Sequence, residues 1–297
     1  IVLGDDDGIL IDESIKFLKK CYDQGIQAIY PKAISYQWPD NSLSTWGSLG
    51  GTIDMNRKPF FTKKINAQKE LNKQMNYGFG YGLGKLPRVY HGFVLNGCLK
   101  KLKEECGTAF PGPSPDMANA VALSTFLENT IFTNKYLVIS GHSKKSAGGM
   151  GGRKEHIGEI KNIDALPKNT SDLWSEKIPF FWSGPTIYAE SARQALVISE
   201  SKLVDKINYN YLLAILNVYE KNFKERIYLT IQKNNLHFFM PKTKRNFIHI
   251  KIFMKRSINF LNNIIKYKFY NMHIAEDIDK ATELIINNLN ERAKNKN

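Results

Sequence analysis

The spacing of apolar residues near the amino terminus predicts a strand, a turn, a helix and a second strand. The apolar run IVL at residues 1–3 is typical of the end of a short buried strand, and residues 4–8 form an acidic turn between two glycines. Residues 12–25 have a helical period, and Gly25 suits the C-cap of that helix. The apolar positions of the helix are Ile15, Leu18 and Tyr22. Together with the strand-like segment 26–36, this succession forms half of an α/β unit.

The pattern continues to about residue 200 and then changes. Helices are predicted for 65–75, 96–107 and 114–129, and a strand is predicted for 135–140. Ser114 is expected to be the N-cap of the third helix. A loop rich in glycine and lysine follows at 141–156. Beyond residue 200, the pattern favours helices over 209–223 and 250–270 and a strand over 225–232.

Charge divides the chain at the same place. Residues 201–297 carry 18 Lys and Arg against 8 Asp and Glu, whereas residues 1–200 carry 24 against 20. Three explanations fit this basic region: a helical extension without a partner, a peripheral membrane surface, or a nucleic-acid interface. The first two are favoured over nucleic acid. No uninterrupted apolar run reaches the ~18 residues of a transmembrane helix, and three cysteines without metal-type spacing indicate reduced thiols in a cytosol.

Three consecutive carboxylates in the acidic turn form the first candidate site. Asp5, Asp6 and Asp7 follow a predicted strand, so they lie at the edge of a sheet where α/β folds bind ligands. Adjacent carboxylates are hard oxygen ligands for Mg²⁺ or Mn²⁺, and such a cation relieves their mutual repulsion. The alternative is a solvated acidic turn that caps the following helix.

Asp116 and the glycine-lysine loop are the next candidates. Asp116 follows a rigid Pro-Gly-Pro-Ser-Pro segment at a helix start, where it is either a general base or a carboxylate that satisfies the helix dipole. The loop 141–156 offers backbone amides, hydroxyls and lysines to an anionic ligand such as a diphosphate. His142 in this loop is a candidate metal ligand or phosphate contact. A disordered basic loop is the alternative.

Aromatic residues suggest an acceptor pocket. Tyr90 and His91 in RVYHGFVLNG, together with Trp182, are candidates to contact a sugar acceptor. The alternatives are a surface histidine and a tryptophan of the core or of a hinge. For Trp174 and Trp182 the structural role is favoured.

Five motifs occur in an order that resembles a known family. They are VLGDDDG, YHGFVLNGCLKKLKEECG, FPGPSPDMANAVALS, LVISGHSKKSAGGMGG and WSGPTIYAES. This order resembles the family 2 inverting glycosyltransferases of bacterial surface-polysaccharide clusters, and the likeness covers roughly residues 1–195. It implies an α/β class with a partial GT-A, Rossmann-like mixed sheet and flanking helices over 1–200. A basic, mainly helical extension would occupy 201–297.

The resemblance also implies roles for the candidate residues. Asp5, Asp6 and Asp7 match the DXD motif, which holds Mn²⁺ or Mg²⁺ and the donor nucleotide, and Asp7 matches its final metal-binding acid. Asp116 matches the base that deprotonates the acceptor hydroxyl. The diphosphate contacts would be His142, Ser143 and Lys144.

The partners implied are a nucleotide-sugar donor and a saccharide or lipid-linked saccharide acceptor. Such an acceptor implies a cytoplasmic protein with peripheral contact to the inner face of the cell membrane through residues 201–297. In-line attack on the anomeric carbon requires a base on one face of the sugar and charge neutralisation at the leaving diphosphate on the other.

In the family, the acid motif ends the first half of the catalytic domain, and that half holds the nucleobase. Here the chain begins inside the strand that leads to the acids, so the resemblance implies a chain without its nucleotide-binding half. Two other functions therefore stay open: an inactive remnant or accessory protein that binds glycan or a partner transferase, and a nucleic-acid-binding protein that acts through its basic tail.

Overall fold

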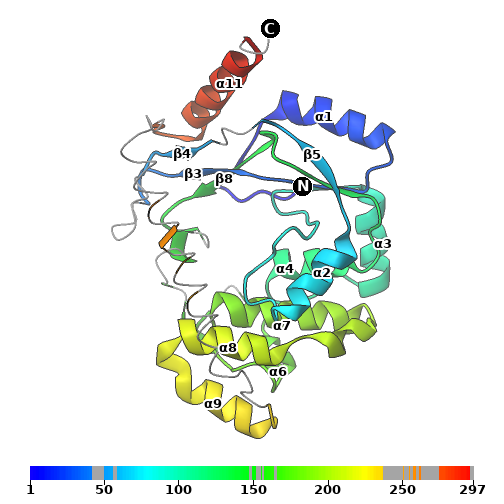
Figure 1. Ribbon diagram of the computed structural model, residues 1–297, viewed down its shortest axis with the longest axis vertical. Coiled ribbons are helices and arrows are strands. Elements are labelled where there is room, and N and C mark those ends of the chain that lie inside the picture. Colours follow the sequence, from blue (N-terminus) through cyan, green and yellow to red (C-terminus); the bar gives the residue numbers. More distant parts are fainter. Residues whose placement is uncertain are drawn as a thin grey trace.

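The computed structural model describes residues 1–41, 50–55, 59–146, 149–151, 155, 157–163, 166–236, 250, 254, 257–258, 261 and 274–294. Within this part of the chain, the protein is a mixed α/β structure with two mixed sheets flanked by helices (Figure 1). The expected α/β class is confirmed, as is a helical carboxyl-terminal end.

Each sheet has a parallel pair of strands at its centre and an antiparallel strand on either side. The first sheet has the order β1 (Gly8–Ile9), β8 (Val138–His142), β3 (Ile34–Gln37) and β4 (Ile53–Asp54). The second has the order β5 (Thr62–Ile65), β7 (Thr130–Thr133), β2 (Ala28–Pro31) and β6 (Phe93–Val94). The parallel pairs are β8 with β3 and β7 with β2.

The two parallel pairs are consecutive sections of one long bent pair. The chain passes from β2 to β3 through two residues, and from β7 to β8 through four. Pro31 is opposite Thr133 in one sheet, and Ile34 is opposite Ile139 in the other, so the β7–β8 side contains three additional residues at the bend. This bend explains why the strand-like segment 26–36 contributes to both sheets.

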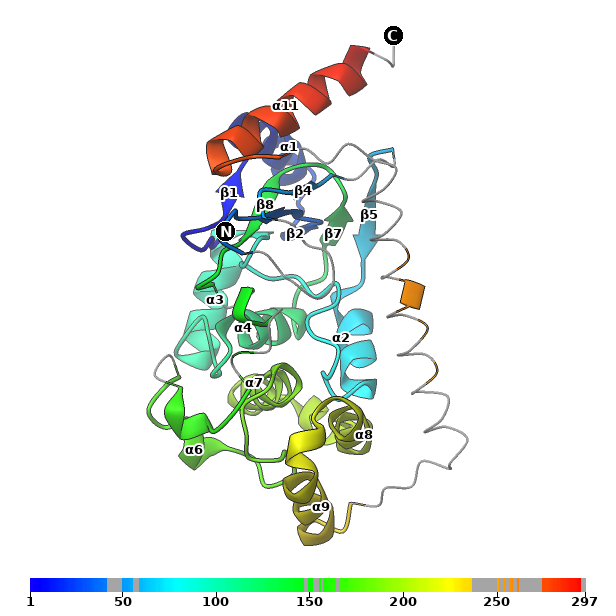
Figure 2. The same cartoon turned by 90° about the vertical axis from the view of Figure 1, so that its left-hand side faces the viewer.

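The helices described in the structure pack around these sheets and below them (Figures 1 and 2). They are α1 (Ile11–Asp23), α2 (Ala67–Asn76), α3 (Asn96–Cys106), α4 (Pro115–Ser124), α6 (Thr170–Leu173), α7 (Gly184–Ile198), α8 (Tyr209–Tyr219), α9 (Lys224–Lys233) and α11 (Ile278–Lys294), with 3₁₀ turns η1 (Ile160–Asn162), η2 (Lys202–Lys206) and η3 (Lys221–Phe223). The strand predicted for 225–232 is wrong, because this segment forms α9. The helix predicted for 250–270 lies largely outside the described residues.

Helix α1 turns only part of its predicted apolar stripe toward the core. Ser14 and Cys21 are buried, whereas Ile15 is 49% exposed and Tyr22 is 69% exposed. The Ser14 hydroxyl donates a hydrogen bond to the Leu137 carbonyl at 3.2 Å, which ties the small polar residue to the start of β8. The amphipathic helix is therefore present, and of the three predicted apolar positions Leu18 packs against the core.

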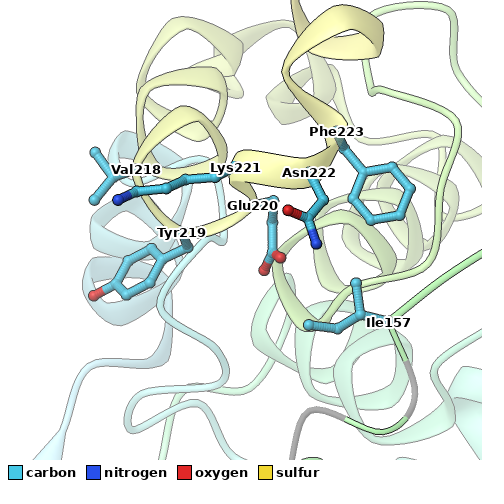
Figure 3. Close-up of a pocket in the computed structure, with 7 residues that line it drawn as sticks. All are labelled: Ile157, Val218, Tyr219, Glu220, Lys221, Asn222 and Phe223. Atoms are coloured by element: carbon cyan, nitrogen blue, oxygen red, sulfur yellow. The ribbon is translucent and has the colours of Figure 1, made fainter.

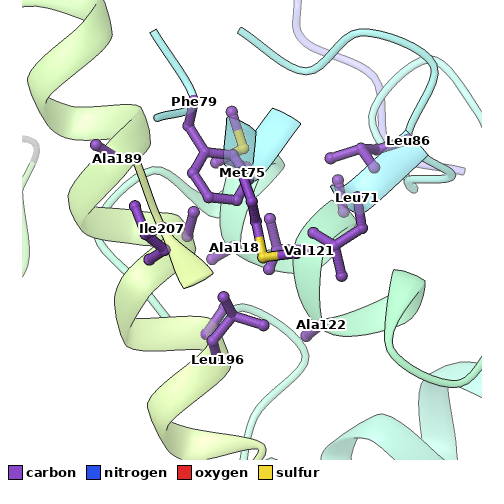
Figure 4. Close-up of a cluster of buried hydrophobic side chains, with 14 of the residues drawn as sticks. Leu71, Met75, Phe79, Leu86, Ala118, Val121, Ala122, Ala189, Leu196 and Ile207 are labelled. Carbon is purple, nitrogen blue, oxygen red and sulfur yellow. The ribbon is translucent and has the colours of Figure 1, made fainter. Parts of the chain in front are cut away.

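The largest core lies among the helices below the sheets. Figure 4 shows Met75 and Phe79 packed against the alanine-rich faces of α4 and α7. Small residues such as Ala118 and Ala189 allow these two helices to approach closely. Ile207 and the first turns of α8 belong to the same core, so the chain after residue 200 is packed against the part before it. No described helix is long and apolar enough to cross a membrane.

Candidate functional site

The acidic turn lies at the carboxyl ends of the central strands of the first sheet. Strand β1 follows the turn directly and runs antiparallel to β8, with Gly8 opposite Ile139. The turn is therefore placed near the carboxyl end of β8. Strand β3 ends beside it, since Gln37 is opposite His142. The carboxyl edge of parallel strands is where α/β folds bind ligands.

Asp7 is the best anchored carboxylate of the turn. Its Oδ2 accepts hydrogen bonds from the Gly4 amide at 2.7 Å and lies 2.7 Å from His91 Nε2, while its Oδ1 accepts from the Gly141 amide at 2.9 Å. Its side chain is only 6% exposed. Burial by itself raises the pKa of Asp7, but His91 and the two amides outweigh it and hold the pKa below its ordinary value.

Asp6 joins the turn to the start of the glycine-lysine loop. Its Oδ2 accepts a hydrogen bond from the Ser143 amide at 3.1 Å, and its carbonyl accepts one from Trp38 Nε1 at 3.0 Å. The Lys144 amide donates to Asp40 Oδ1 at 3.2 Å. The amides expected to hold a diphosphate are thus bonded to carboxylates in this structure. Asp5, in contrast, is exposed.

Gly141 makes this close packing possible. A Cβ at this position would lie 1.7 Å from the Asp6 carbonyl oxygen. We therefore expect Gly141→Ala to push the turn away from β8 and to lower the free energy of unfolding by about 1–3 kcal/mol.

Gly97→Ala is the matched control, since a Cβ at Gly97 meets no atom within 4 Å. Because Gly97 lies in α3, alanine there should leave stability unchanged or raise it by up to about 1 kcal/mol. Urea unfolding followed by circular dichroism measures both variants. Equal midpoints for the two would contradict the close approach at Gly141.

His142 lies at the end of β8, beside the same carboxylates. Burial lowers the pKa of His142, which the nearby charges of Asp6 and Asp7 oppose. The imidazole is therefore neutral at neutral pH, which suits a hydrogen-bonding role better than the role of a fixed cation.

Asp116 lies in the first turn of α4, as expected. Its Oδ1 accepts a hydrogen bond from the Met117 amide at 2.7 Å and another from the Ser114 hydroxyl. Ser114 occupies the N-cap position, as expected, and its side chain bonds to Asp116 rather than to a helix amide. The carboxylate is thus held at a fixed place at the helix start.

A short segment, residues 88–91, connects Asp116 with the acidic turn. The Val89 amide donates to Asn119 Oδ1, one turn beyond Asp116, at 3.1 Å. Tyr90 forms a parallel bridge with Val2, and His91 contacts Asp7. His91 has a φ of 54°, a left-handed conformation that is uncommon outside glycine and concentrates at functional sites.

The charge of Asp116 affects two tyrosines, Tyr90 in this segment and Tyr188 on α7. Burial and then the charge of Asp116 raise the pKa of Tyr90. The same two causes, partly offset by Arg88, raise the pKa of Tyr188 on α7 to about 12. Asp116, Tyr90 and Tyr188 therefore share one electrostatic environment.

The pattern analysis missed Arg88 and Tyr188. Arg88 is buried, and its guanidinium lies 4.1 Å from the centre of the Tyr30 ring. Both residues belong to sequence motifs described above, Arg88 to RVYHG and Tyr188 to TIYAES. The sequence around them does not indicate which distant residues they lie near in the fold. Only the fold brings them to Asp116.

The structure brings some of the expected site residues into contact and places the two tryptophans elsewhere. Contacts within the described structure join Asp6, Asp7, His91 and the segment 141–144, and Tyr90 lies between them and Asp116. Trp182 lies just before α7, where its backbone pairs with Gly158. Trp174 Nε1 donates to the Ile178 carbonyl at 2.9 Å, which agrees with the structural role favoured for it.

The donor set of the turn is partly occupied in this conformation. Oδ2 of Asp7 has two protein partners and Oδ1 has one, which leaves a lone pair on Oδ1 for the expected Mn²⁺ or Mg²⁺. Within the described ranges, no group of three or more His, Cys, Asp or Glu side chains is placed to hold a metal ion. His91 and two backbone amides contact the carboxylate of Asp7.

A cavity lies at the other end of the molecule, between α8, η3 and the segment around Ile157 (Figure 3). Its volume is about 570 Å³, and Glu220 and Asn222 point into it in the close-up. Nearby, Phe223 stacks on Phe181 with 4.2 Å between ring centres, so this wall is firmly packed.

Comparison with known proteins gave no match: no protein-family model, no curated protein and no solved structure is similar to this chain.

Proposed function

We propose that the protein is an inverting glycosyltransferase. It would transfer a sugar from a nucleotide-sugar to a saccharide or lipid-linked saccharide acceptor in surface-polysaccharide synthesis. One observation supports the proposal: two motifs far apart in the sequence meet at one sheet edge, and a short segment links them to a third. The acidic turn contacts the β8 end at residues 141–144, and residues 88–91 contact both the acidic turn and the helix that begins at Asp116.

The reaction requires a base on the acceptor side and charge stabilisation on the donor side. The acceptor oxygen would bond to the anomeric carbon as the bond between that carbon and the diphosphate oxygen breaks, and Asp116 would take the acceptor's proton. A single in-line displacement inverts the configuration. Tyr90 and Tyr188 would line the acceptor side because both lie within the field of Asp116. Residues His142, Ser143 and Lys144 would contact the diphosphate.

A second candidate is favoured by the neutralised acidic turn. Asp7 is satisfied by His91 and two amides, as expected for a protein that binds a glycan or a partner transferase without metal-assisted chemistry. The transferase requires a nucleotide-sugar donor, whereas the binding protein does not. The cation expected from the resemblance, Mn²⁺ or Mg²⁺, is therefore included as one arm of the experiment.

Nucleotide release from a panel of UDP-, GDP-, dTDP- and CMP-sugars tests the proposal. The intact chain is incubated with each donor and an oligosaccharide acceptor, with Mn²⁺, with Mg²⁺ or with EDTA, and calorimetry measures donor binding under the same conditions. We expect one nucleotide class to bind and to be turned over. Donor binding without turnover, or glycan binding without donor binding, would favour the accessory protein and overturn the transferase.

A further inference from the structure

Helix α1 exposes three large apolar side chains on one side. Ile11 is 61% exposed, Ile15 is 49% exposed and Tyr22 is 69% exposed. Their spacing of i, i+4 and i+11 places them on the same face of the helix, and these three residues are here called the α1 face. Figure 1 shows α1, in blue, on the outside of the sheets. The α1 face is therefore open to another molecule.

Exposed apolar residues on α7 and α9 are arranged differently. Val197 and Ile198 are exposed on α7, and Tyr228 and Leu229 are exposed on α9. Each pair consists of sequence neighbours, whose side chains point about 100° apart around a helix axis. Large apolar side chains that share one exposed face, as in α1, usually mark a surface that another molecule covers.

The apolar positions of α1 are symmetric about the middle of the helix. They are Ile11, Ile15, Leu18 and Tyr22, and their spacing is the same when the helix is read in reverse. Leu18 is half-buried, since part of its surface packs against the core. Two antiparallel copies of α1 related by a twofold axis would place Ile11 beside Tyr22 of the second copy. The same axis would place Ile15 beside Leu18.

Two charged residues next to the α1 face complement each other in the same arrangement. Asp12 and Lys19 are exposed, and they lie on one flank of the face, about 100° and 80° from Ile11 around the helix axis. Neither forms an ion pair with another residue of the described ranges. The twofold axis brings Asp12 of each copy within about 3 Å, along the helix axis, of Lys19 of the other. Opposite charges would thus meet at two places.

The charge balance of α1 also favours a second copy over other partners. The helix contains three acids and three lysines, whereas the whole chain carries a net charge of +14. A strongly basic surface would repel a second copy, but α1 would not. An anionic bilayer or a nucleic acid requires a basic face, which α1 does not offer.

We propose that the α1 face pairs with the α1 face of a second copy of this chain in an antiparallel, twofold arrangement. Helix α1 has 13 residues and is therefore about 20 Å long. A contact between two such helices is smaller than the ~1,600 Å² of a standard interface. The dimer should therefore be weak and reversible, with a Kd of about 1–100 μM. The inference does not depend on sugar transfer.

Sedimentation velocity of the intact protein over about 1–200 μM tests the proposal. We expect the sedimentation coefficient to rise from that of a 34.0 kDa monomer toward that of a dimer. Ile15→Asp should raise the Kd about tenfold or more, because its carboxylate would be buried against Leu18 of the second copy. A protein that stays monomeric throughout this range would overturn the proposal, as would a dimer that Ile15→Asp leaves unchanged.

Leu229→Asp on α9 is the matched control. It makes the same change at a similarly exposed aliphatic residue, 57% against 49% for Ile15, outside the α1 face. It should leave the Kd within about twofold of the original value. Circular dichroism establishes that all variants are folded.

An exchange of the two charges tests the antiparallel arrangement. Lys19→Asp places an acid beside Asp12 of the second copy and should raise the Kd about two- to fivefold. The double variant Asp12→Lys/Lys19→Asp restores opposite charges and should return the Kd to within about twofold of the original value. If the double variant dimerised no better than Lys19→Asp alone, the antiparallel arrangement would be wrong.

Discussion

Asp116→Asn should lower the rate of sugar transfer about 100- to 10,000-fold, the contribution of a general base. The amide has nearly the shape of the carboxylate but cannot accept the acceptor's proton. The fold should be retained, because the asparagine oxygen can still accept from the Ser114 hydroxyl and the Met117 amide, as Asp116 does. Initial rates of nucleotide release, with the donor identified by the panel, measure the effect.

Asp12→Asn provides the matched control for this variant. Asp12 is also an acidic residue in the first turn of a helix, α1, and it is exposed. Its replacement removes the same charge from a helix start without touching the candidate site. If both variants kept rates within about twofold of the original protein, Asp116 would only stabilise the start of its helix and would not be the catalytic base.

Asp7→Ala should lower the free energy of unfolding by about 2–4 kcal/mol at neutral pH. The substitution removes the acceptor for the amides of Gly4 and Gly141 and the partner of His91. Each buried donor left without a partner costs about 1–3 kcal/mol, and the exposed side of the turn recovers part of this in water. Urea unfolding midpoints and slopes measure the loss.

The pH dependence of the unfolding free energy provides a second test of this prediction. The folded state lowers the pKa of Asp7, so its stabilising effect is present above the pKa of an unfolded aspartate and disappears as the pH falls through the lower folded value. The difference between Asp7→Ala and the original protein should therefore shrink in acid. Asp5→Ala, at the exposed neighbour, should change stability by less than about 0.5 kcal/mol. A constant gap across pH would show that the carboxylate charge is not what stabilises the turn.

Local signals in the sequence predicted the helices best. Pro115 at the start of α4 and Gly25 with a φ of 66° after α1 are features that the chain carries within a few residues. Such signals do not need the rest of the fold. They also placed Asp116 correctly in the first turn of α4.

Two predictions from the local hydrophobic pattern differ from the structure because of tertiary packing. The segment 225–232 alternates Ile227, Leu229 and Ile231, which is typical of a strand, yet Ile227 and Ile231 also share one face of a helix, and the core is on that side. In α1, Ser14 is buried and bonds to the start of β8, whereas Ile15 and Tyr22 of the predicted apolar stripe are exposed. Neither outcome can be read from periodicity, since it depends on which neighbour offers a surface.

The candidate site was predictable in its parts but not in its connections. The order of the motifs indicated that the acidic turn, the glycine-lysine loop and Asp116 belong together. The partners that hold the acidic turn could not be predicted: His91 at Asp7, Gly141 at Asp7 and Ser143 at Asp6. These contacts join residues more than eighty positions apart, and no local spacing encodes them.

The long bent pair of strands also sets an order of assembly. Strands β2 and β3 emerge from the ribosome about a hundred residues before β7 and β8, their parallel partners. Such a large loop must close before either sheet gains its central contacts, and distant pairings of this kind form slowly. The acidic turn rests on Gly141 at the far end of that pair. The acidic turn is therefore synthesised long before β8 and reaches its final place only after β8 has formed.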